Sequence, residues 1–210
     1  MSIESQSIDC SRAAERFFRF YFRHCTEPDQ DTLFSLLNAI HSLNDRLRQS
    51  RGADFFEFDE FIALKALRNL FHHKQELINE IKGLPVLEDM PIQSDLLTMC
   101  LAPRKLALQA IQEERRPENR SRVESALKWY GDVVDLNPAI FNFTVHAYEK
   151  LVKLDINMDD DAVAAFACSY QTEEEQGFPH FVSGTISCRA GDVNEILRSI
   201  FLGANQRAES

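Results

Sequence analysis

The sequence predicts a mainly α-helical protein. Gly and Pro each occur only seven times in 210 residues, so few positions break a helix or form a tight turn. Long stretches are rich in Leu, Ala, Glu, Lys and Arg, which are the residues with the highest helix propensity. A content of 44% apolar residues, with 16 phenylalanines, is enough for a packed core. We therefore expect helices joined by short connections.

Two amphipathic helices are expected over residues 8–24 and 31–49, where apolar residues recur every three or four positions. Pro28 and Asp29 separate them, and Gly52 ends the second. Four arginines at helical spacing give the first helix a basic face: Arg12, Arg16, Arg19 and Arg23. Such a face suits either the RNA backbone or plain solvation by water.

A third and longer helix is expected over residues 58–81, because the sequence keeps helical spacing until Gly83 and Pro85. This is roughly 24 residues, or about 36 Å at a rise of about 1.5 Å per residue. One side of the helix is apolar: Leu64, Leu67, Phe71, Ile78 and Ile81. The other side is polar: Arg68, Asn69, His72, His73 and Glu76. We expect the apolar side to pack against the core.

Four further helices are predicted in the next part of the chain, over residues 94–97, 106–114, 122–134 and 138–154. A loop over residues 86–93 precedes them, and Pro103 separates the first two. The charged residues 115–122 connect the second of these helices to the third. Asn137 as N-cap and Pro138 at the first helical position predict the start of the last one.

The pattern changes in the last quarter of the chain. Apolar and polar residues alternate over residues 181–188, which predicts a strand. A partner strand is expected over residues 162–170, although that segment equally suits a helix, and a last helix is expected over 193–202. The predicted fold is an up-and-down helical bundle over residues 1–154, followed by a small acidic α+β segment over residues 155–210.

The chain carries 23 basic and 33 acidic residues, which give a net charge of −10. A protein that binds nucleic acid usually needs a basic surface, because its affinity depends largely on neutralising phosphates. Residues 1–83 carry 11 basic and 13 acidic residues (−2), residues 84–153 carry 9 and 10 (−1), and residues 154–210 carry 3 and 10 (−7). The acidity therefore belongs mainly to the C-terminal end, and the charge of the helical part allows RNA binding.

Several classes of function are disfavoured by what the sequence lacks. No stretch approaches the ~18 consecutive apolar residues that span a membrane, and no secretion signal opens the chain, so a cytoplasmic location is expected. Five cysteines without a C-x-x-C pair favour reduced thiols over disulfides or a zinc site. No Gly-rich phosphate loop precedes a helix. We expect no metal and no cofactor.

The most informative pattern runs from Arg68 to His73 and reads Arg-Asn-Leu-Phe-His-His. It places a fixed cation, an amide and a titratable imidazole within little more than one helical turn. A guanidinium can hold a phosphate by two hydrogen bonds, and an imidazole can transfer protons near neutral pH. The pattern suits RNA cleavage. It equally suits a solvated helix face on which Arg68 pairs with nearby acids.

This pattern resembles the Arg-x4-6-His motif of ribonucleases in the HEPN superfamily, helical proteins named for higher eukaryotes and prokaryotes nucleotide-binding. The setting is similar too, with two amphipathic helices before the motif helix, a loop at residues 51–54 and further helices after it. The resemblance covers about residues 8–154. It implies a HEPN-like bundle, metal-independent RNA cleavage by attack of the ribose 2′-hydroxyl, and a homodimer in which two motif helices form one site.

The resemblance also implies roles for four candidate catalytic residues: Arg68, Asn69, His72 and His73. Arg68 would bind the phosphate and stabilise the transition state. His73 would act as the acid or base, with His72 as a substitute. Asn69 would orient a histidine or a phosphate oxygen.

Ribonucleases of this superfamily often add an acidic residue from a neighbouring helix, and the resemblance makes Asp45 and Glu76 the candidates here. The resemblance further implies RNA as the substrate, and a regulatory protein or antitoxin as a partner in prokaryotic defence or stress response. The alternative is a non-catalytic helical protein, a dimerising adaptor or regulator that uses its acidic end for binding.

Overall fold

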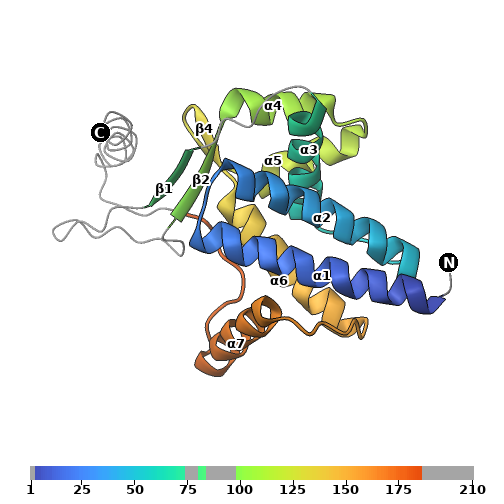
Figure 1. Cartoon of the computed structure of the whole chain (residues 1–210). Helices are drawn as coiled ribbons and strands as arrows, with labels where there is room; N and C mark the ends of the chain where they lie inside the picture. Colours follow the sequence, from blue (N-terminus) through green and yellow to red (C-terminus); the bar gives the residue numbers. More distant parts are fainter. Residues whose placement is uncertain (1–2, 74–79, 84–97, 186–210) are drawn as a thin grey trace.

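The computed structural model describes residues 3–73, 80–83 and 98–185, with the side chains of residues 7–71 and 98–185 (Figure 1). Within these ranges the chain forms seven helices and four short strands. The predicted mainly α-helical class is confirmed. None of the described helices is both long and apolar enough to cross a membrane.

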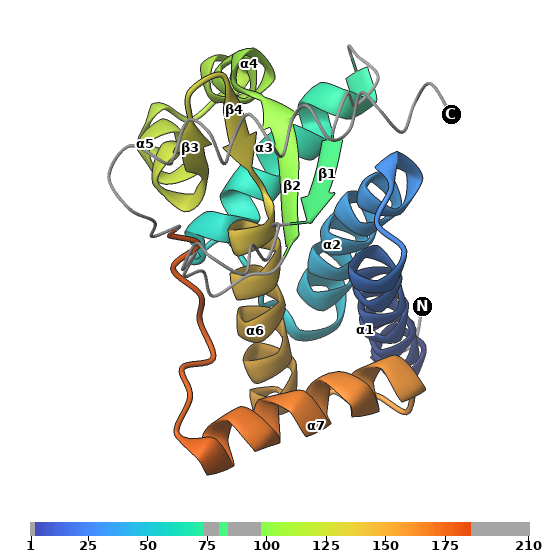
Figure 2. The same ribbon diagram turned by 90° about the vertical axis from the view of Figure 1, so that its left-hand side faces the viewer.

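The first two helices, α1 (Ile3–Thr26) and α2 (Gln30–Arg51), lie side by side and run in opposite directions (Figure 1, Figure 2). Both were predicted. Phe17 and Phe18 of α1 are fully buried. The leucine-rich stripe of α2 is buried as well: Leu33, Leu36, Leu37, Ile40, Leu43 and Leu47. Because these stripes pack into the core, most polar residues of α2 lie on its remaining side, while Thr32 and Asn44 are buried.

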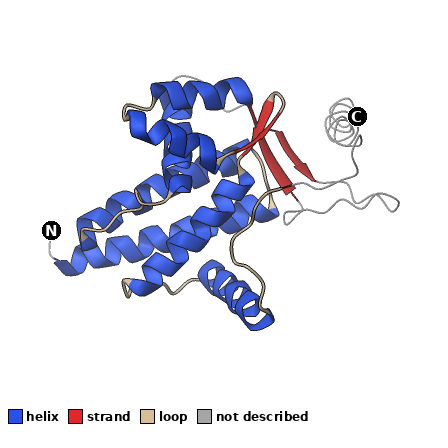
Figure 3. Ribbon diagram, turned by 180° about the vertical axis from the view of Figure 1, so that it is seen from behind, coloured by secondary structure: helices blue, strands red, loops and turns tan. Residues whose placement is uncertain are grey.

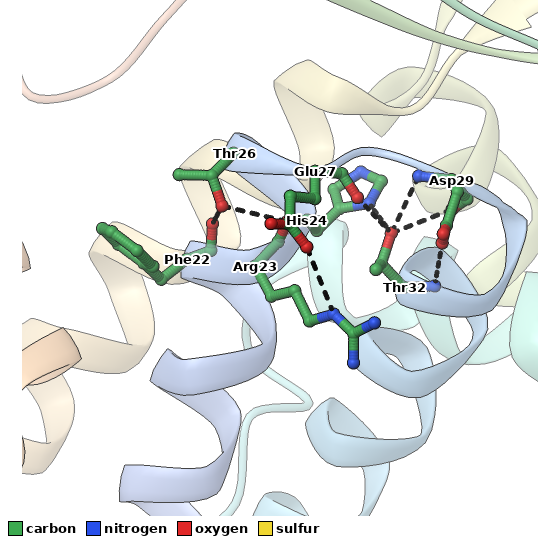
Figure 4. Close-up of polar contacts among 7 residues, drawn as sticks. All are labelled: Phe22, Arg23, His24, Thr26, Glu27, Asp29 and Thr32. Atoms are coloured by element: carbon green, nitrogen blue, oxygen red, sulfur yellow. Dashed lines mark hydrogen bonds and ion pairs between the residues drawn. The ribbon is translucent and has the colours of Figure 1, made fainter.

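A capping box fixes the start of α2 (Figure 4). The backbone N–H of Thr32 donates to Asp29 Oδ1 (2.6 Å), and the backbone N–H of Asp29 donates to Thr32 Oγ1 (2.9 Å). The same hydroxyl oxygen lies 3.3 Å from Nδ1 of His24, a buried side chain of α1. Burial lowers the pKa of His24. This polar network ties the end of α1 to the start of α2.

Helix α3 (Asp59–His73) begins where it was expected but does not extend to residue 81. Residues 80–83 form strand β1 (Glu80–Gly83) instead, so the predicted end of the helix was wrong. This strand pairs antiparallel with β2 (Thr98–Pro103), and Ile81 lies opposite Cys100. Ile81 keeps the helical spacing of the sequence, but its branched side chain suits a strand equally well. The pairing joins residues about 20 apart, which local periodicity does not indicate.

After β2 the chain forms α4 (Arg104–Glu113), close to the helix predicted over residues 106–114. Next comes α5 (Pro117–Ala126), which includes most of the stretch expected to be a charged connection. Pro117 lies in the first turn of α5, where its missing N–H is not needed. The loop and the short helix predicted over residues 86–97 lie outside the described residues.

The helix predicted over residues 122–134 is confirmed only over residues 122–126, which belong to α5, and a β-hairpin takes the place of the rest. Strands β3 (Lys128–Tyr130) and β4 (Val133–Asp135) pair antiparallel around a turn at Gly131, whose φ of 52° is in the left-handed region. Strand β4 also pairs with β2, which gives an antiparallel sheet with the order β1-β2-β4-β3 (Figure 3). The sheet lies near the turn between α1 and α2 (Figure 1).

Helix α6 (Asn137–Lys153) agrees with the helix predicted over residues 138–154. Asn137 is its first residue rather than its N-cap. The carboxylate of Asp135 accepts the backbone N–H of Asn137 (3.1 Å) and so takes over the capping role. It also accepts the N–H of Cys100 (2.8 Å), which links the start of α6 to β2.

Helix α7 (Asp161–Gln176) settles the two alternatives for residues 162–170 in favour of a helix. It lies across α1, where the ring of Phe166 contacts the rings of Phe18 and Tyr21 (Figure 2). Residues 181–185 form no strand, contrary to prediction. The rest of that strand and the last predicted helix lie outside the described residues. The domain boundary at residue 154 stays a prediction.

Aromatic rings join α1, α3 and α6 into one core. The ring of Phe143 in α6 contacts Phe17 of α1 at a centroid distance of 5.8 Å. It also contacts Phe55 and Phe61, at 5.3 and 5.7 Å. The predicted apolar side of α3 is buried as far as its side chains are described: Leu64, Leu67 and Phe71. This packing fixes the orientation of α3 and so the side on which its polar residues lie.

Candidate functional site

Arg68 lies on the polar side of α3, half-buried against α2. Its Nε donates to Oδ1 of Asn38 on α2 (3.0 Å), and its Nη1 donates to Oδ1 of Asn69 (3.4 Å). Both acceptors are neutral amide oxygens. They orient the guanidinium without cancelling its charge, unlike the carboxylate partner of an ordinary salt bridge.

His41 lies one turn after Asn38 on α2, and its Nδ1 is 3.3 Å from Oδ2 of Asp45. Burial lowers the pKa of His41. The Asp45 carboxylate raises the pKa of His41, while the nearby cations Arg68 and Lys65 lower it further. The neutral imidazole is therefore favoured near neutral pH, and a neutral imidazole can accept a proton.

These side chains meet because each helix carries its polar residues at helical spacing opposite a buried stripe. On α2 these residues are Asn38, His41 and Asp45, and on α3 they are Lys65, Arg68 and Asn69. The packing of α2 on α3 then brings the two polar sides together. We call this group the α2–α3 polar cluster, and its members are Asn38, His41, Asp45, Lys65, Arg68 and Asn69.

The structure brings together some of the residues predicted from the sequence. Arg68 and Asn69 are in contact, and Asp45 lies beside His41. Asn69 was expected to orient a histidine or a phosphate oxygen, but its described contact orients Arg68. His72 and His73 are the last two residues of α3, and their side chains lie outside the described part of the chain. Glu76 also lies outside it.

Sequence reasoning missed three members of the α2–α3 polar cluster: Asn38 and His41 on α2, and Lys65 on α3. A signal for them does exist. Asn38, His41 and Asp45 recur at helical spacing on the side of α2 that lacks leucines. What the sequence does not contain is the pairing of this side with α3, because Asn38 and Arg68 are 30 residues apart.

The basic face predicted on α1 is exposed and partly neutralised. Arg19 forms an ion pair with Asp160 at 2.5 Å, and Arg23 lies 4.0 Å from Glu27. Exposed pairs of this kind contribute little stability but reduce the net charge of the face. They favour the solvated interpretation of this face over RNA binding.

Comparisons with models of known protein families, with curated proteins and with solved structures found no match. The resemblance to HEPN ribonucleases therefore depends on the Arg68–His73 motif and on its helical setting. Within the described ranges, no group of three or more His, Cys, Asp or Glu side chains is placed to hold a metal ion.

Proposed function

We propose that this protein is a metal-independent endoribonuclease whose active site forms where two copies of α3 meet in a homodimer. The observation that supports this most is the environment of Arg68. Its two described partners are neutral amides on α2 and α3, and its position is only half-buried. A guanidinium held in this way is oriented but keeps its charge for an anion.

In the proposed reaction, the ribose 2′-oxygen attacks the adjacent phosphorus, so that the O2′–P bond forms and the P–O5′ bond breaks. A base takes the 2′-hydroxyl proton, and an acid protonates the departing 5′-oxygen. Arg68 binds the phosphate oxygens and stabilises the charge that builds up on them. No metal is needed, because a cation and two proton-transfer groups are enough.

Imidazoles supply the acid and the base in this scheme. The motif supplies His73, with His72 as a substitute. His41 adds an imidazole from α2 whose lowered pKa suits a base, and Asp45 orients it through Nδ1. A base with one carboxylate partner and a nearby cation is a common arrangement for proton transfer.

A homodimer is part of the proposal because one chain provides one Arg68 and one motif. Two facing motifs would surround a phosphate with two guanidinium groups and several imidazoles. RNA is the proposed substrate, and a regulatory protein or antitoxin is the proposed partner, in the setting of prokaryotic defence or stress response. The rival function is a non-catalytic dimerising adaptor, which the acidic and largely exposed residues 173–175 at the end of α7 favour.

The test is RNA cleavage in the presence of EDTA. We expect the wild-type protein to cut single-stranded RNA, and the variants Arg68→Ala and His73→Ala each to be at least about 100-fold slower. Arg12→Ala, which removes an exposed arginine from α1, is the matched control and should cut at the wild-type rate. Equal cleavage by wild type and both motif variants would exclude this site, and no cleavage by the wild type would favour the adaptor.

A further inference from the structure

A cavity of about 530 Å³ lies between α3 and the segment formed by α4 and α5. This volume is within the range of small-molecule binding sites, roughly 300–1,000 Å³. Asn69 lines the cavity, and the Oδ1 atom of Asn69 also accepts the hydrogen bond from Arg68. The cavity and the α2–α3 polar cluster therefore share a side chain, and Lys65 is a second member common to both.

The inner wall of the cavity is apolar and includes an aromatic ring. Ala66, Leu70 and Ala110 line it and are 5%, 2% and 2% exposed. The ring of Phe56 is half-buried and packs edge-on against Phe61, with centroids 5.2 Å apart. An apolar wall with a positioned phenyl ring suits a flat aromatic group such as a nucleobase.

The outer rim of the cavity is cationic. Lys65 places Nζ 5.5 Å from the centroid of the Phe56 ring. Arg115 and Arg116 are exposed at the rim, and neither side chain forms an ion pair or hydrogen bond with another described residue. Unpaired guanidinium groups beside an apolar wall suit a ligand that has a phosphate next to a base.

Two glutamates also line the cavity, but both have other partners. The Glu114 carboxylate accepts the backbone N–H of Arg116 (3.2 Å) and the side-chain N–H of Asn119 (3.4 Å). Glu113 accepts a hydrogen bond from Gln109 (2.9 Å). With three cations and two carboxylates, the lining has a formal charge of +1, whereas the whole chain has −10.

We propose that this cavity binds one nucleotide of a single-stranded RNA, next to the phosphate that Arg68 holds. The base packs against Phe56 and the apolar wall, and its phosphate is bound by Lys65, Arg115 and Arg116. Asn69 stands between this nucleotide and the phosphate at Arg68. The inference depends on the proposed ribonuclease function, because it names where the substrate strand lies.

The first test measures binding of adenosine 3′-monophosphate to the full chain by calorimetry, in EDTA and at low salt. We expect Arg115→Gln/Arg116→Gln to weaken the affinity at least about tenfold, because two charged phosphate contacts are lost. Arg12→Gln is the control, since Arg12 is an exposed arginine of α1 and does not line the cavity. Equal affinities for the double variant and the control would overturn the proposal.

The second test separates the base from the phosphate. Phe56→Leu keeps an apolar side chain but removes the ring, so the nucleotide affinity should fall about five- to tenfold. The concentration of inorganic phosphate that displaces half of the bound nucleotide should remain as in wild type. Phe178→Leu, at a phenylalanine that is 63% exposed on the C-terminal side of α7, is the control. Thermal melting of each variant checks its fold, and Arg115→Gln alone replaces the double variant if that one melts early.

The outcomes distinguish this proposal from the ribonuclease proposal. Nucleotide binding that depends on Arg115 and Arg116, without any cleavage of RNA, would keep the cavity as a nucleotide site and remove the nuclease function. Cleavage that depends on Arg68, with nucleotide binding unchanged in every cavity variant, would keep the nuclease and overturn the cavity assignment.

Discussion

The partners of an arginine decide whether its charge is used within the fold or remains available. Arg122 is an example of the first kind, because its guanidinium is bonded to the Asp59 carboxylate and to the carbonyl oxygens of Phe56 and Glu57. It joins α5 to the start of α3. Arg68 is of the second kind as far as its described partners show, because both are neutral amides.

The charge of Arg68 can be cancelled without changing the shape of the site. Asn38→Asp keeps an oxygen within hydrogen-bond distance of Arg68 Nε but makes it a carboxylate. The variant gains an ion pair but loses the hydrogen bond from Asn38 Nδ2 to the Phe34 carbonyl (3.0 Å), so we expect thermal stability to stay close to that of wild type. RNA cleavage should fall at least about tenfold, because the guanidinium is then paired. The measurement is the initial cleavage rate beside the melting temperature.

A matched control for this variant is available on the same helix. Gln49 also accepts a hydrogen bond from an arginine, Arg46, at 3.1 Å, and Gln49 is exposed. Gln49→Glu should leave the cleavage rate unchanged. If Asn38→Asp and Gln49→Glu behaved alike, the amide environment of Arg68 would have no bearing on function.

Asp135 is a buried carboxylate that should make stability depend on pH. It is 3% exposed, and burial raises its pKa from 3.8 to about 6, although three backbone N–H groups oppose this. A raised pKa in the folded state contributes stability that is complete below pH 3.8 and is lost as pH rises to about 6. The free energy of unfolding should fall by on the order of 3 kcal/mol over this pH range.

Asp135→Asn tests this, because an amide oxygen can accept the N–H groups of Cys100 and Asn137 without the buried charge. The free energy of unfolding of the variant relative to wild type should rise between pH 4 and pH 6 by about 3 kcal/mol and then stay level. Denaturant titrations across this range measure it. Asp132→Asn, at an exposed aspartate in the adjacent turn, should follow wild type. A constant difference for Asp135→Asn would contradict the account.

At the level of elements, the turn between α1 and α2 determines where the α2 side of the cluster lies. Thr32 is 2% exposed and serves both the capping box and His24. Thr32→Val keeps the shape but removes the hydroxyl that accepts the Asp29 N–H and lies beside the His24 imidazole, which should cost about 2 kcal/mol of stability. Thr26→Val is the control, since Thr26 is exposed and bonds only to carbonyls of its own helix. Equal melting temperatures for both variants would show that the network contributes nothing.

Helices α1, α2 and α6 could be predicted because each is long and keeps one apolar stripe throughout. The β3–β4 hairpin could not, because its strands have three residues each and its turn offers only Gly131 as a local signal. Its strand β4 is completed by pairing with β2, where Leu101 lies opposite Asp135. Pairing between strands far apart in the sequence depends on tertiary structure. The same holds for β1, which forms where the end of the third helix was predicted.

In the candidate site, too, some residues could be predicted from local sequence and others could not. The motif of Arg68 and Asn69 is local and could be recognised from one helix. Asn38 and His41 join it only through the packing of α2 on α3, so their role could not be predicted from spacing alone. A helical wheel predicts which residues share a side, but it does not predict which side meets which.

For the molecule as a whole, the proposal requires two chains. We expect light scattering to give twice the chain mass of 24.1 kDa at micromolar concentration. Cleavage per chain should fall on dilution, in parallel with dissociation of the dimer, because the site needs both motifs. Arg68→Ala should remain a dimer, which serves as the control for assembly. A monomer with full activity per chain at every concentration would contradict a shared site.

The central claim is that the ribose 2′-hydroxyl attacks the phosphorus beside Arg68. The most direct measurement uses an RNA with one mapped cleavage position, incubated in EDTA, and a second strand in which the nucleotide before that position is 2′-deoxy. We expect the first strand to give fragments ending in 2′,3′-cyclic phosphate, and the second to be cut at least about 100-fold more slowly at that position. Equal cleavage of the two strands, or fragments that carry 3′-hydroxyl ends, would contradict the mechanism.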